Sequence, residues 1–474
     1  MEGQNCSETE NQNPQIVVVM VPLPMQGHLN QLLHLSHLVT SFGIPVHFAG
    51  SATHNRQAKQ RLHGWDHDSL TKIHFHDFQL PPYTSHPAPS KPGHSIPYPT
   101  HLYPLFEAAA QHLREPVSQL VHQLSTMFRR VIVVHDIVMS SVVQDVISIP
   151  NAELYCLIPI SAFTLFFNFW EKLAEKPFQL DSTDIPEYLP SNEGCTPPEI
   201  ARFSTNQIKL LRPETGWIYN TSRPVEGKYV ELFEKLSPNA ERKHFVLGPF
   251  NPVEFNSRSG EQRHQCLEWL DDQEQNSVIY VSFGSSTSLS YEQIRELAIG
   301  LERSGQKFVW VIRNSDSVDV FAEGEKRRPQ LPEGYEERVK NRGIVVADWA
   351  PQLEILAHPS TGGFMSHCGW NSCIESISMG VPIAAWPMHS DQPRNTVLVT
   401  DVLKIGTPVR DWAHCDQLVM SSTIENAVST LMATEEGQQM RKRATDLGHA
   451  VRGSLAKGGA AHSEMCSFIA HITR

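Results

Sequence analysis

The segment from Trp349 to Gln392 concentrates residue types that can bind a nucleotide sugar. Trp349 and Gln352 lie near one end, a His-Cys-Gly-Trp-Asn-Ser run occupies 367–372, and Asp391 precedes Gln392 at the other end. An aromatic ring can stack on a base, a helix start can receive phosphates through its amides, and polar side chains can bond hydroxyls. The segment contains no Lys or Arg. A pyrophosphate bound here would therefore be met mainly by backbone amides and neutral side chains.

Ser372 and Glu375 have the spacing of a capping box, at the start of a predicted helix that ends near Gly380. In one interpretation, the two side chains only satisfy backbone amides at the helix start. In the other, His367, Asn371 and Ser372 surround a helix start that receives phosphate, while Glu375 accepts hydrogen bonds from ribose hydroxyls. The residues alone leave both interpretations open.

A second phosphate-proximal candidate is the turn Gly284–Ser288, which contains Ser285 and Ser286. It follows a predicted strand and precedes a predicted helix, so it either approaches a phosphate or is simply a tight turn. The sequence has no Walker pattern and no GxGxxG. Their absence argues against an ATPase and against an ordinary dinucleotide enzyme.

His28 and Asp136 are the candidate acid–base pair. His28 lies at the start of the first predicted helix, and Asp136 ends a different strand. A lone histidine there is most often a surface or capping residue, but a helix N-terminus disfavours the imidazolium and would help keep the ring able to accept a proton. The carboxyl ends of parallel strands share one edge, so the fold can bring Asp136 to the ring. It would then fix the tautomer and stabilise the imidazolium formed during reaction.

Size and composition indicate a globular chain with more than one core. A length of 474 residues suggests two domains, and 40% apolar with 19% charged residues is typical of soluble proteins. The net charge of −12 argues against nucleic acid or an anionic membrane as partner. No apolar run is long enough to cross a membrane, and no Lys or Arg precedes Arg56, unlike a signal peptide. Eight cysteines without CxxC pairs favour a reducing, cytoplasmic location.

Histidines and aromatic residues also cluster in the first half. Fifteen of the 24 histidines precede residue 137, but His74 and His76 would supply only two ligands on one strand face, and no cluster completes a metal site. We therefore predict neither a metal nor a permanently bound cofactor. The Phe/Trp cluster at 163–170 belongs to the core or borders an apolar pocket, with the core the more frequent outcome.

Strands and helices alternate in both halves of the chain. Continuously apolar runs predict buried parallel strands, and periodic apolar residues predict helices at 29–42 and 291–303. The pattern predicts an α/β protein with two doubly wound, Rossmann-like domains facing each other across a cleft, with ligands at the carboxyl ends of the strands. Residues 81–104, rich in Pro, His and Ser, predict a long surface loop. The predicted strands are 16–21, 44–48, 130–134, 277–283, 308–312 and 343–347.

The segment from Trp349 to Gln392 resembles, over its full length, the signature of the plant secondary-product glycosyltransferases, a family of UDP-glycosyltransferases. The resemblance extends to Pro24–His28, to Ser282–Ser285 and to the order of the strands. More narrowly, the chain is similar to the branch of zeatin O-glucosyltransferases and zeatin O-xylosyltransferases. The stretches that carry this narrower resemblance are 26–36, 219–223 and 388–395.

The resemblance implies a GT-B fold and a division of labour between the two halves. After a disordered tail at 1–14, an acceptor-binding domain would occupy 15–250. A linker at 251–262 would lead to a UDP-sugar donor-binding domain at 263–455. A helix within 456–474 would pack back on the first domain.

The resemblance also implies a role for each candidate residue. His28 would be the general base and Asp136 its partner. The donor residues fall into groups that contact the nucleoside, the diphosphate and the sugar, and Gln392 at the last signature position usually accompanies glucose. The implied donor-site residues are Trp349, which would stack on uracil, Ala350, Gln352 and Glu375 for the nucleoside; Ser285, His367, Asn371 and Ser372 for the diphosphate; and Trp370, Asp391 and Gln392 for the sugar.

The resulting hypothesis is an inverting, metal-independent O-glucosyltransferase that uses UDP-glucose on a small hydroxylated plant metabolite. The acceptor would be a cytokinin such as zeatin, a flavonoid, another phenolic or a terpenoid, and the enzyme is expected to be a monomer. Two alternatives stay open within enzymes, namely UDP-xylose as donor and transfer to carbon. An alternative of another class is a nucleotide-sugar-binding protein without catalysis.

Overall fold

The computed structural model describes most of the chain. Several sequence-based predictions lie outside the described residues, namely the tail at 1–14, part of the linker (256–262), most of the Pro/His-rich loop (82–99), and Ser285 with Ser286. The described residues are 15–59, 71–81, 100–181, 185–212, 215–236, 242–255, 263–284, 287, 289–312, 330–347 and 349–474.

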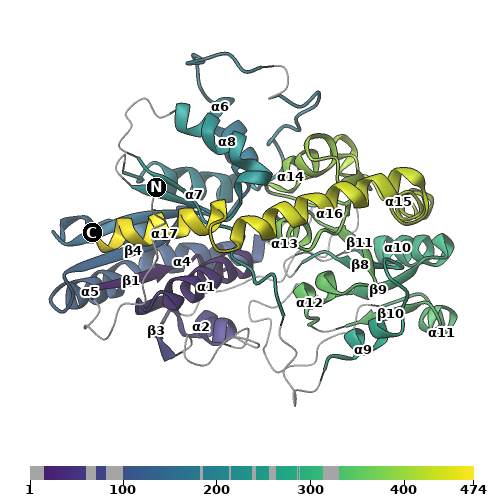
Figure 1. Ribbon diagram of the computed structural model, residues 1–474, viewed down its shortest axis with the longest axis horizontal. Coiled ribbons are helices and arrows are strands. Elements are labelled where there is room, and N and C mark those ends of the chain that lie inside the picture. Colours follow the sequence, from purple (N-terminus) through teal and green to yellow (C-terminus); the bar gives the residue numbers. More distant parts are fainter. Residues whose placement is uncertain are drawn as a thin grey trace.

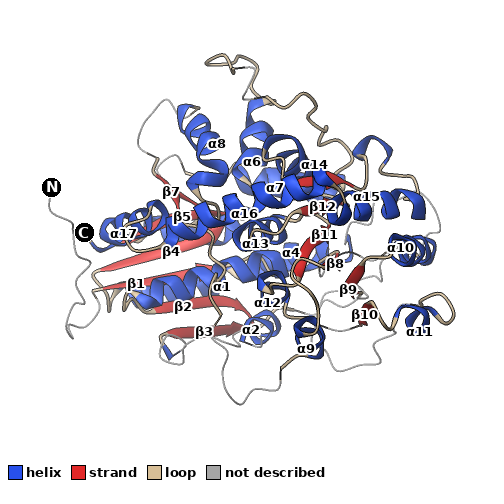
Figure 2. Ribbon diagram, turned by 45° about the vertical axis from the view of Figure 1, so that its right-hand side comes forward, coloured by secondary structure: helices blue, strands red, loops and turns tan. Residues whose placement is uncertain are grey.

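The described residues form two parallel sheets, each with helices on both faces (Figure 2). The first sheet has the strand order β3-β2-β1-β4-β5-β6-β7, and the second has the order β10-β9-β8-β11-β12-β13. The strands of the first sheet are β1 (Ile16–Val21), β2 (Val46–Ser51), β3 (Ile73–Phe78), β4 (Arg130–Asp136), β5 (Ala152–Ile158), β6 (Gly216–Tyr219) and β7 (His244–Val246). Those of the second are β8 (Val278–Ser282), β9 (Lys307–Val311), β10 (Gly343–Val346), β11 (Thr361–Ser366), β12 (Ile383–Ala385) and β13 (Gly406–Pro408).

The helices follow the strands in alternation. In the first half they are α1 (Gln26–Ser41), α2 (Ala52–Lys59), α4 (Tyr103–His112), α5 (Arg114–Ser125), α6 (Ala162–Trp170), α7 (Pro198–Ile208) and α8 (Arg223–Lys235). The rest are α9 (Gln265–Asp271), α10 (Tyr291–Ser304), α11 (Tyr335–Val339), α12 (Gln352–Ala357), α13 (Trp370–Met379), α14 (Gln392–Val397), α15 (Ser421–Ala433), α16 (Glu435–Leu455) and α17 (Ala460–Thr473). Shorter turns are η1 (Thr100–Leu102), η2 (Ile137–Val143), η3 (Asp145–Ser148), η4 (Leu398–Val402) and η5 (Trp412–His414).

Strand β1 shows why the apolar runs form central strands. All six of its residues are buried, as the continuous apolar run predicts. Val17 and Val19 pack against helices α4 and α5, while Val18 and Met20 point to the opposite face and pack against α1 and α17. A strand covered on both faces needs apolar side chains at every position. The prediction of two doubly wound α/β units is confirmed.

The end of the chain returns to the first sheet. In Figure 1, the yellow helices α16 and α17 run from the second half of the molecule to the first. Phe468 of α17 packs its ring on Tyr155 and Phe245, with centroid distances of 5.5 Å and 5.0 Å. Arg130 Nη1 donates a hydrogen bond to the carbonyl of Arg474 at 2.9 Å. Helix α17 therefore completes one face of the N-terminal sheet.

The two halves also share a buried hydrophobic cluster. It contains Phe163 and Phe166 of α6, together with Trp370 and Ile374 of α13 and Val397 of α14. Domains joined mainly by polar contacts usually move relative to one another, whereas a large apolar interface resists such motion. This cluster therefore fixes the position of the two sheets relative to each other.

Most predicted strand and helix boundaries differ from the structure by one to three residues. Strand β2 runs over Val46–Ser51 rather than 44–48. The predicted loop at 81–104 is wrong at its end, where η1 begins at Thr100 and α4 at Tyr103. Pro104 occupies the first turn of α4, where its missing N–H costs no helical hydrogen bond. A proline that indicates a loop in sequence is here a helix-start residue.

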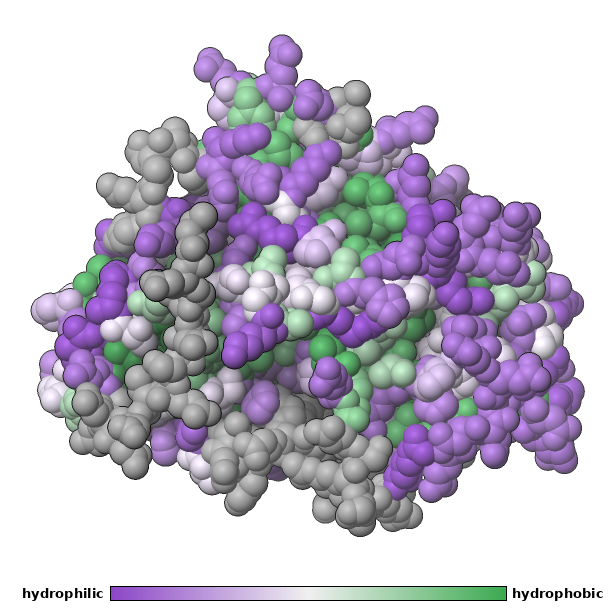
Figure 3. All heavy atoms as spheres, viewed as in Figure 1, coloured by the Kyte–Doolittle hydropathy of each residue, from purple (hydrophilic) through white to green (hydrophobic). Residues whose placement is uncertain are grey.

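No helix within the described ranges is long and apolar enough to span a membrane. On the face shown in Figure 3, described hydrophobic residues form separate patches among hydrophilic ones. Isolated apolar side chains of this kind are normal on folded proteins.

Glu226 of α8 is a buried acid that holds the start of α6. Its side chain is 1% exposed, and its two oxygens accept hydrogen bonds from the backbone amides of Ala162 at 3.1 Å and Phe163 at 2.8 Å. Amides in the first turn of a helix have no partner within the helix itself, and a carboxylate also complements the partial positive charge there. Burial outweighs these bonds and raises the pKa of Glu226 to about 7.

We expect a pH-dependent stability difference between wild type and the Glu226→Gln variant. The folded protein retains a proton on Glu226 up to about pH 7, whereas the unfolded chain releases it near the ordinary value of 4.5. Raising the pH through this window should therefore destabilise wild type relative to the variant, by on the order of 3 kcal/mol. Melting temperatures of both proteins at about pH 5 and about pH 8 would show this change. A difference that stays constant across the window would contradict it.

Candidate active site

One cavity of about 2180 Å³ lies between the two halves of the chain. Side chains of α1, α6 and α7 line it from the first half, and residues of α12, α13 and the start of α14 line it from the second. His28 and all the described donor-site candidates border this cavity. These candidates are Trp349, Ala350, Gln352, His367, Trp370, Asn371, Ser372, Glu375, Asp391 and Gln392.

His28 and Asp136 are in direct contact. His28 Nδ1 lies 2.6 Å from Asp136 Oδ2, and Asp136 is fully buried behind the ring. The other oxygen, Oδ1, accepts a hydrogen bond from the amide of Val138 at 3.0 Å. Because the carboxylate occupies Nδ1, the neutral ring carries its proton there and leaves Nε2 as the acceptor. The two residues come from the start of α1 and the end of β4, which pairs with β1.

The electrostatics of His28 differ from the expectation of a helix start that keeps the ring neutral. Burial is the largest influence and by itself lowers the pKa of His28. The charge and hydrogen bond of Asp136, and then the charge of Asp391, raise it and together outweigh burial. The pKa therefore lies above the ordinary value of 6.5, which corrects the expectation drawn from the helix start alone.

Helix α13 begins at the cavity without a side-chain cap. Gly369 is its N-cap residue, and no side chain in the described part of the chain caps it. His367 lies beside this start and against Gly369 and Gly284. A Cβ atom added to Gly369 would lie only 2.5 Å from His367 Nε2, and one added to Gly284 would lie 2.8 Å from the same nitrogen. Burial lowers the pKa of His367 to about 4, so the ring is neutral at physiological pH. The arrangement offers amides and a neutral imidazole to an anion.

The capping-box interpretation of Ser372 and Glu375 is wrong. Ser372 is the third residue of α13 rather than its cap, and both side chains turn to Gln352 at the start of α12. Gln352 Nε2 donates to Glu375 Oε2 at 2.6 Å and to Ser372 Oγ at 3.2 Å. Tyr280 donates from its hydroxyl to Gln352 Oε1 at 3.3 Å. These contacts form a polar wall of the cavity instead of a helix cap.

Trp349 lines the same cavity as this polar wall. Its side chain is 43% exposed, although it is one of the largest apolar residues. An exposed ring bordering a cavity can stack on a planar ligand group. Its neighbour Ala350 is 5% exposed and forms part of the cavity floor.

Two side chains at the start of α13 reach the N-terminal half. Asn371 Nδ2 donates to the carbonyl of Gly27 at 2.7 Å, directly before His28. Trp370 Nε1 donates to the carbonyl of Asn220 at 2.8 Å, and only 3% of its side chain is exposed. Trp370 is therefore mainly an interface residue that reaches the cavity with a small part of its surface.

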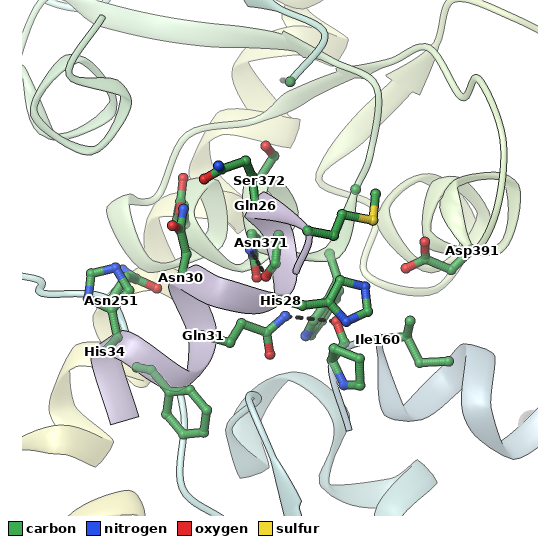
Figure 4. A pocket seen from close by; sticks show the side chains of 18 of the residues that line it. Gln26, His28, Asn30, Gln31, His34, Ile160, Asn251, Asn371, Ser372 and Asp391 are labelled. Atoms are coloured by element: carbon green, nitrogen blue, oxygen red, sulfur yellow. Dashed lines mark hydrogen bonds between the residues drawn. The ribbon is translucent and has the colours of Figure 1, made fainter. Parts of the chain in front are cut away.

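Asp391 and Gln392 close the end of the cavity next to His28. Figure 4 shows His28, Asp391 and Ile160 bordering the same space. Gln392 Oε1 accepts from the amides of Met388 at 2.8 Å and His389 at 2.9 Å, which fixes the carboxamide. Burial is the main influence on Asp391 and raises its pKa.

The apolar wall that the first half contributes to the cavity was only partly indicated by the sequence. It includes Phe106, Leu165, Phe169 and Phe203, which come from α4, α6 and α7. The aromatic cluster at 163–170 was the only signal. Phe163, Phe166 and Phe167 lie in the core, while Phe169 borders the cavity, so the cluster has both roles. Among the described residues, no group of three or more His, Cys, Asp or Glu is arranged to hold a metal ion.

Comparison with known proteins shows the family of the chain. Residues 14–252 match the family model described as "Glycosyltransferase, N-terminal domain", and residues 256–443 match the model "UDP-glucoronosyl and UDP-glucosyl transferase". Among solved structures, UGT2 of Phytolacca americana complexed with UDP-2-fluoro-glucose and pterostilbene superposes with a TM-score of 0.75 at 25% identity, covering 98% of this chain and 100% of that chain. A UGT transferase of Siraitia grosvenorii in complex with UDP has the same TM-score and identity, with 97% and 100% covered.

The chain belongs to the plant UDP-glycosyltransferases, enzymes of GT-B fold that bind a UDP-sugar, as its sequence signature predicts. Within that family it lies in the branch of zeatin O-glucosyl- and O-xylosyltransferases. It is 52% identical to the zeatin O-glucosyltransferase of Phaseolus lunatus, over 97% of both chains. It is 50% identical to the zeatin O-xylosyltransferase of Phaseolus vulgaris, over 98% of this chain and 99% of that protein.

Replacing Asp136 with Asn should lower the pKa of His28. The variant removes the charge that raises this pKa and leaves the burial that lowers it. An NMR titration of the His28 ring would measure the change, with His28→Gln identifying the resonance. Asp145→Asn is the matched control, since Asp145 is an exposed partner of Arg114 on another surface. A His28 pKa that is unchanged or higher in the Asp136 variant would refute the electrostatic account.

Proposed function

We propose that the enzyme transfers glucose from UDP-glucose to a hydroxyl group of a small plant metabolite, with a zeatin-type cytokinin as the first acceptor to test. The observation that carries the proposal is the His28–Asp136 contact at 2.6 Å on the same cavity as the uncapped start of α13. The first group can remove a proton from an acceptor, and the second can bind the diphosphate that leaves. Their common cavity supports transfer rather than binding alone.

The proposed reaction is a single displacement. His28 Nε2 takes the proton of the acceptor hydroxyl while that oxygen attacks the anomeric carbon of the sugar. The bond between this carbon and the UDP oxygen breaks, and UDP leaves with the electron pair toward the amides of α13. Asp136 stabilises the imidazolium that forms. Attack from the side opposite UDP inverts the anomeric centre, and no step requires a metal ion.

The two halves have different proposed roles. Residues 15–250 would bind the acceptor, because the cavity wall there includes Leu165, Phe169 and Phe203. Residues 263–455 would bind the donor. There, Trp349 would stack on uracil, and the wall formed by Gln352 and Glu375 would bond the nucleoside. His367, Asn371 and Ser372 would hold the diphosphate, and Trp370, Asp391 and Gln392 would contact the sugar.

Replacing His28 with Ala should lower kcat by about 10²- to 10⁴-fold, the usual contribution of a general base. The dissociation constant for UDP should change little, because the proposed UDP contacts belong to other elements. Turnover assays and calorimetric titration with UDP would measure the two quantities. His122→Ala on the exposed face of α5 serves as the control. A His28 variant that keeps nearly wild-type turnover on an alcohol acceptor would exclude the proposed base.

The preference of the enzyme for UDP-glucose or UDP-xylose is the second point to test. Gln392 favours glucose, whereas the similar identities to a glucosyl- and a xylosyltransferase favour neither sugar. We expect a preference for UDP-glucose when both donors compete, with O-linked products identified by mass spectrometry. Trans-zeatin, cis-zeatin and several flavonoids would serve as acceptors, each with and without EDTA. Predominant xylosylation would overturn the glucose assignment, and C-linked products or UDP binding without any product would support the corresponding alternatives.

A further inference from the structure

Asn395 is a buried carboxamide outside the residues that border the cavity. It lies in α14, four positions after Asp391, and is fully buried. Its side chain makes four hydrogen bonds to three separate segments. The oxygen Oδ1 accepts from the hydroxyls of Ser161 at 2.7 Å and Thr164 at 3.1 Å. The nitrogen Nδ2 donates to the carbonyl of Cys368 at 2.9 Å and to Asp391 Oδ2 at 2.8 Å.

The chemistry of these partners fixes the orientation of the carboxamide. A carbonyl and a carboxylate can only accept, so both require the NH₂ group of Asn395. The two hydroxyls can donate, so they satisfy the oxygen. Every hydrogen-bonding position of the side chain is therefore used, and in a buried network each loss leaves a polar group unpaired.

The partners belong to the two halves of the enzyme. Ser161 is the N-cap of α6, whose first amides are bonded by Glu226 and which carries Leu165 and Phe169 of the acceptor-side wall. Cys368 directly precedes the N-cap of α13 and has a left-handed backbone conformation, with φ of 61°. A single side chain thus connects the acceptor wall, the helix start for the diphosphate, and the carboxylate next to His28.

We propose that Asn395 is a positioning residue that sets the carboxylate of Asp391 against the sugar and relative to the acceptor helix α6. This inference rests on the proposed contact of Asp391 with the sugar. Asn395 does not touch substrate in this account. It acts through Asp391, which borders the cavity, and through the position of Cys368.

The Asn395→Asp variant distinguishes positioning from a general structural role. The new carboxylate can still accept from Ser161 and Thr164, but its second oxygen faces Asp391 where the NH₂ group was. Two carboxylates at this distance cannot both remain ionised without strong repulsion, so they share one proton when it is available. With that proton, the introduced carboxyl group can donate to Asp391, while the carbonyl of Cys368 loses its donor. Without it, the two charges repel and Asp391 is displaced.

The pH profile of the Asn395→Asp variant also depends on the titratable groups near Asp391. His28 faces it across the cavity, and the thiols of Cys195 and Cys373 lie near it. Burial raises the pKa of Cys195 to about 12, and the neighbouring Cys368, together with burial, raises that of Cys373, so both thiols stay neutral. His28, and Glu226 with its pKa of about 7, titrate in wild type and variant alike, and the ratio of their rates at each pH largely removes both effects.

The experiment compares kcat of wild type, Asn395→Asp and Asn395→Leu from about pH 6 to about pH 8, with calorimetric titration of UDP for each protein. We expect kcat of the Leu variant to fall by about 10²-fold, as for a misplaced active-site group, with the UDP dissociation constant nearly unchanged. The activity of the Asp variant relative to wild type should rise as the pH falls. Thr396→Val is the matched control in the same helix, because the buried Thr396 hydroxyl has no hydrogen-bond partner among the described residues.

Two results would overturn the inference. One is a ratio of Asp variant to wild type that is constant across the pH range, and the other is a loss of UDP affinity as large as the loss of kcat. If the Leu variant does not fold, the ratio for the Asp variant decides alone. The assay uses whichever UDP-sugar and acceptor the wild-type enzyme turns over. A failure of UDP-glucose or zeatin as substrate therefore counts against the proposed function and leaves the test of Asn395 intact.

Discussion

The hydrogen bond from Asn371 Nδ2 to the carbonyl of Gly27 joins two helix starts that belong to different sheets. Helix α1 carries His28, and helix α13 is the proposed binding site of the diphosphate. A displacement needs the attacking oxygen and the leaving group in line, so the two starts must keep one relative position. The shared hydrophobic cluster around Trp370 and Phe163 restricts movement of the two halves relative to each other. The hydrogen bond from Asn371 to Gly27 aligns the two helix starts.

The charges around the cavity follow from the same junction. Asp136 comes from the first sheet and Asp391 from the second, and both raise the pKa of His28. Both halves of the chain therefore contribute to the raised pKa of His28. At the start of α13, by contrast, burial lowers the pKa of His367 and keeps its ring neutral, and a helix start carries a partial positive charge on its amides. Under the proposed function, an anionic ligand there would meet helix dipoles rather than charged side chains.

The sequence was sufficient for the parts whose signal is local. The continuous apolar run of β1 and the signature from Trp349 to Gln392 predicted the fold class and the family. The capping-box interpretation was wrong because the side chains of Ser372 and Glu375 bond Gln352, which lies at least twenty positions away in the sequence. The apolar wall of the cavity was indicated only by the aromatic cluster at 163–170, and Asn395 gave no signal, because a carboxamide with partners in two distant segments looks in sequence like any polar helix residue. Contacts between distant segments decide such roles, and spacing does not encode them.

The return of α17 to the first sheet has a consequence for biosynthesis. One face of the N-terminal sheet is covered in part by Phe468 and its neighbours, which leave the ribosome only after both sheets have been translated. Phe468 follows Phe245 by 223 residues (468 − 245) and Tyr155 by 313 residues (468 − 155), so both rings lack this contact until the later part of the chain is made. The N-terminal sheet is therefore synthesised first, but its apolar face is fully covered only when α17 has been made. Until then, this exposed apolar face is a surface to which chaperones can bind.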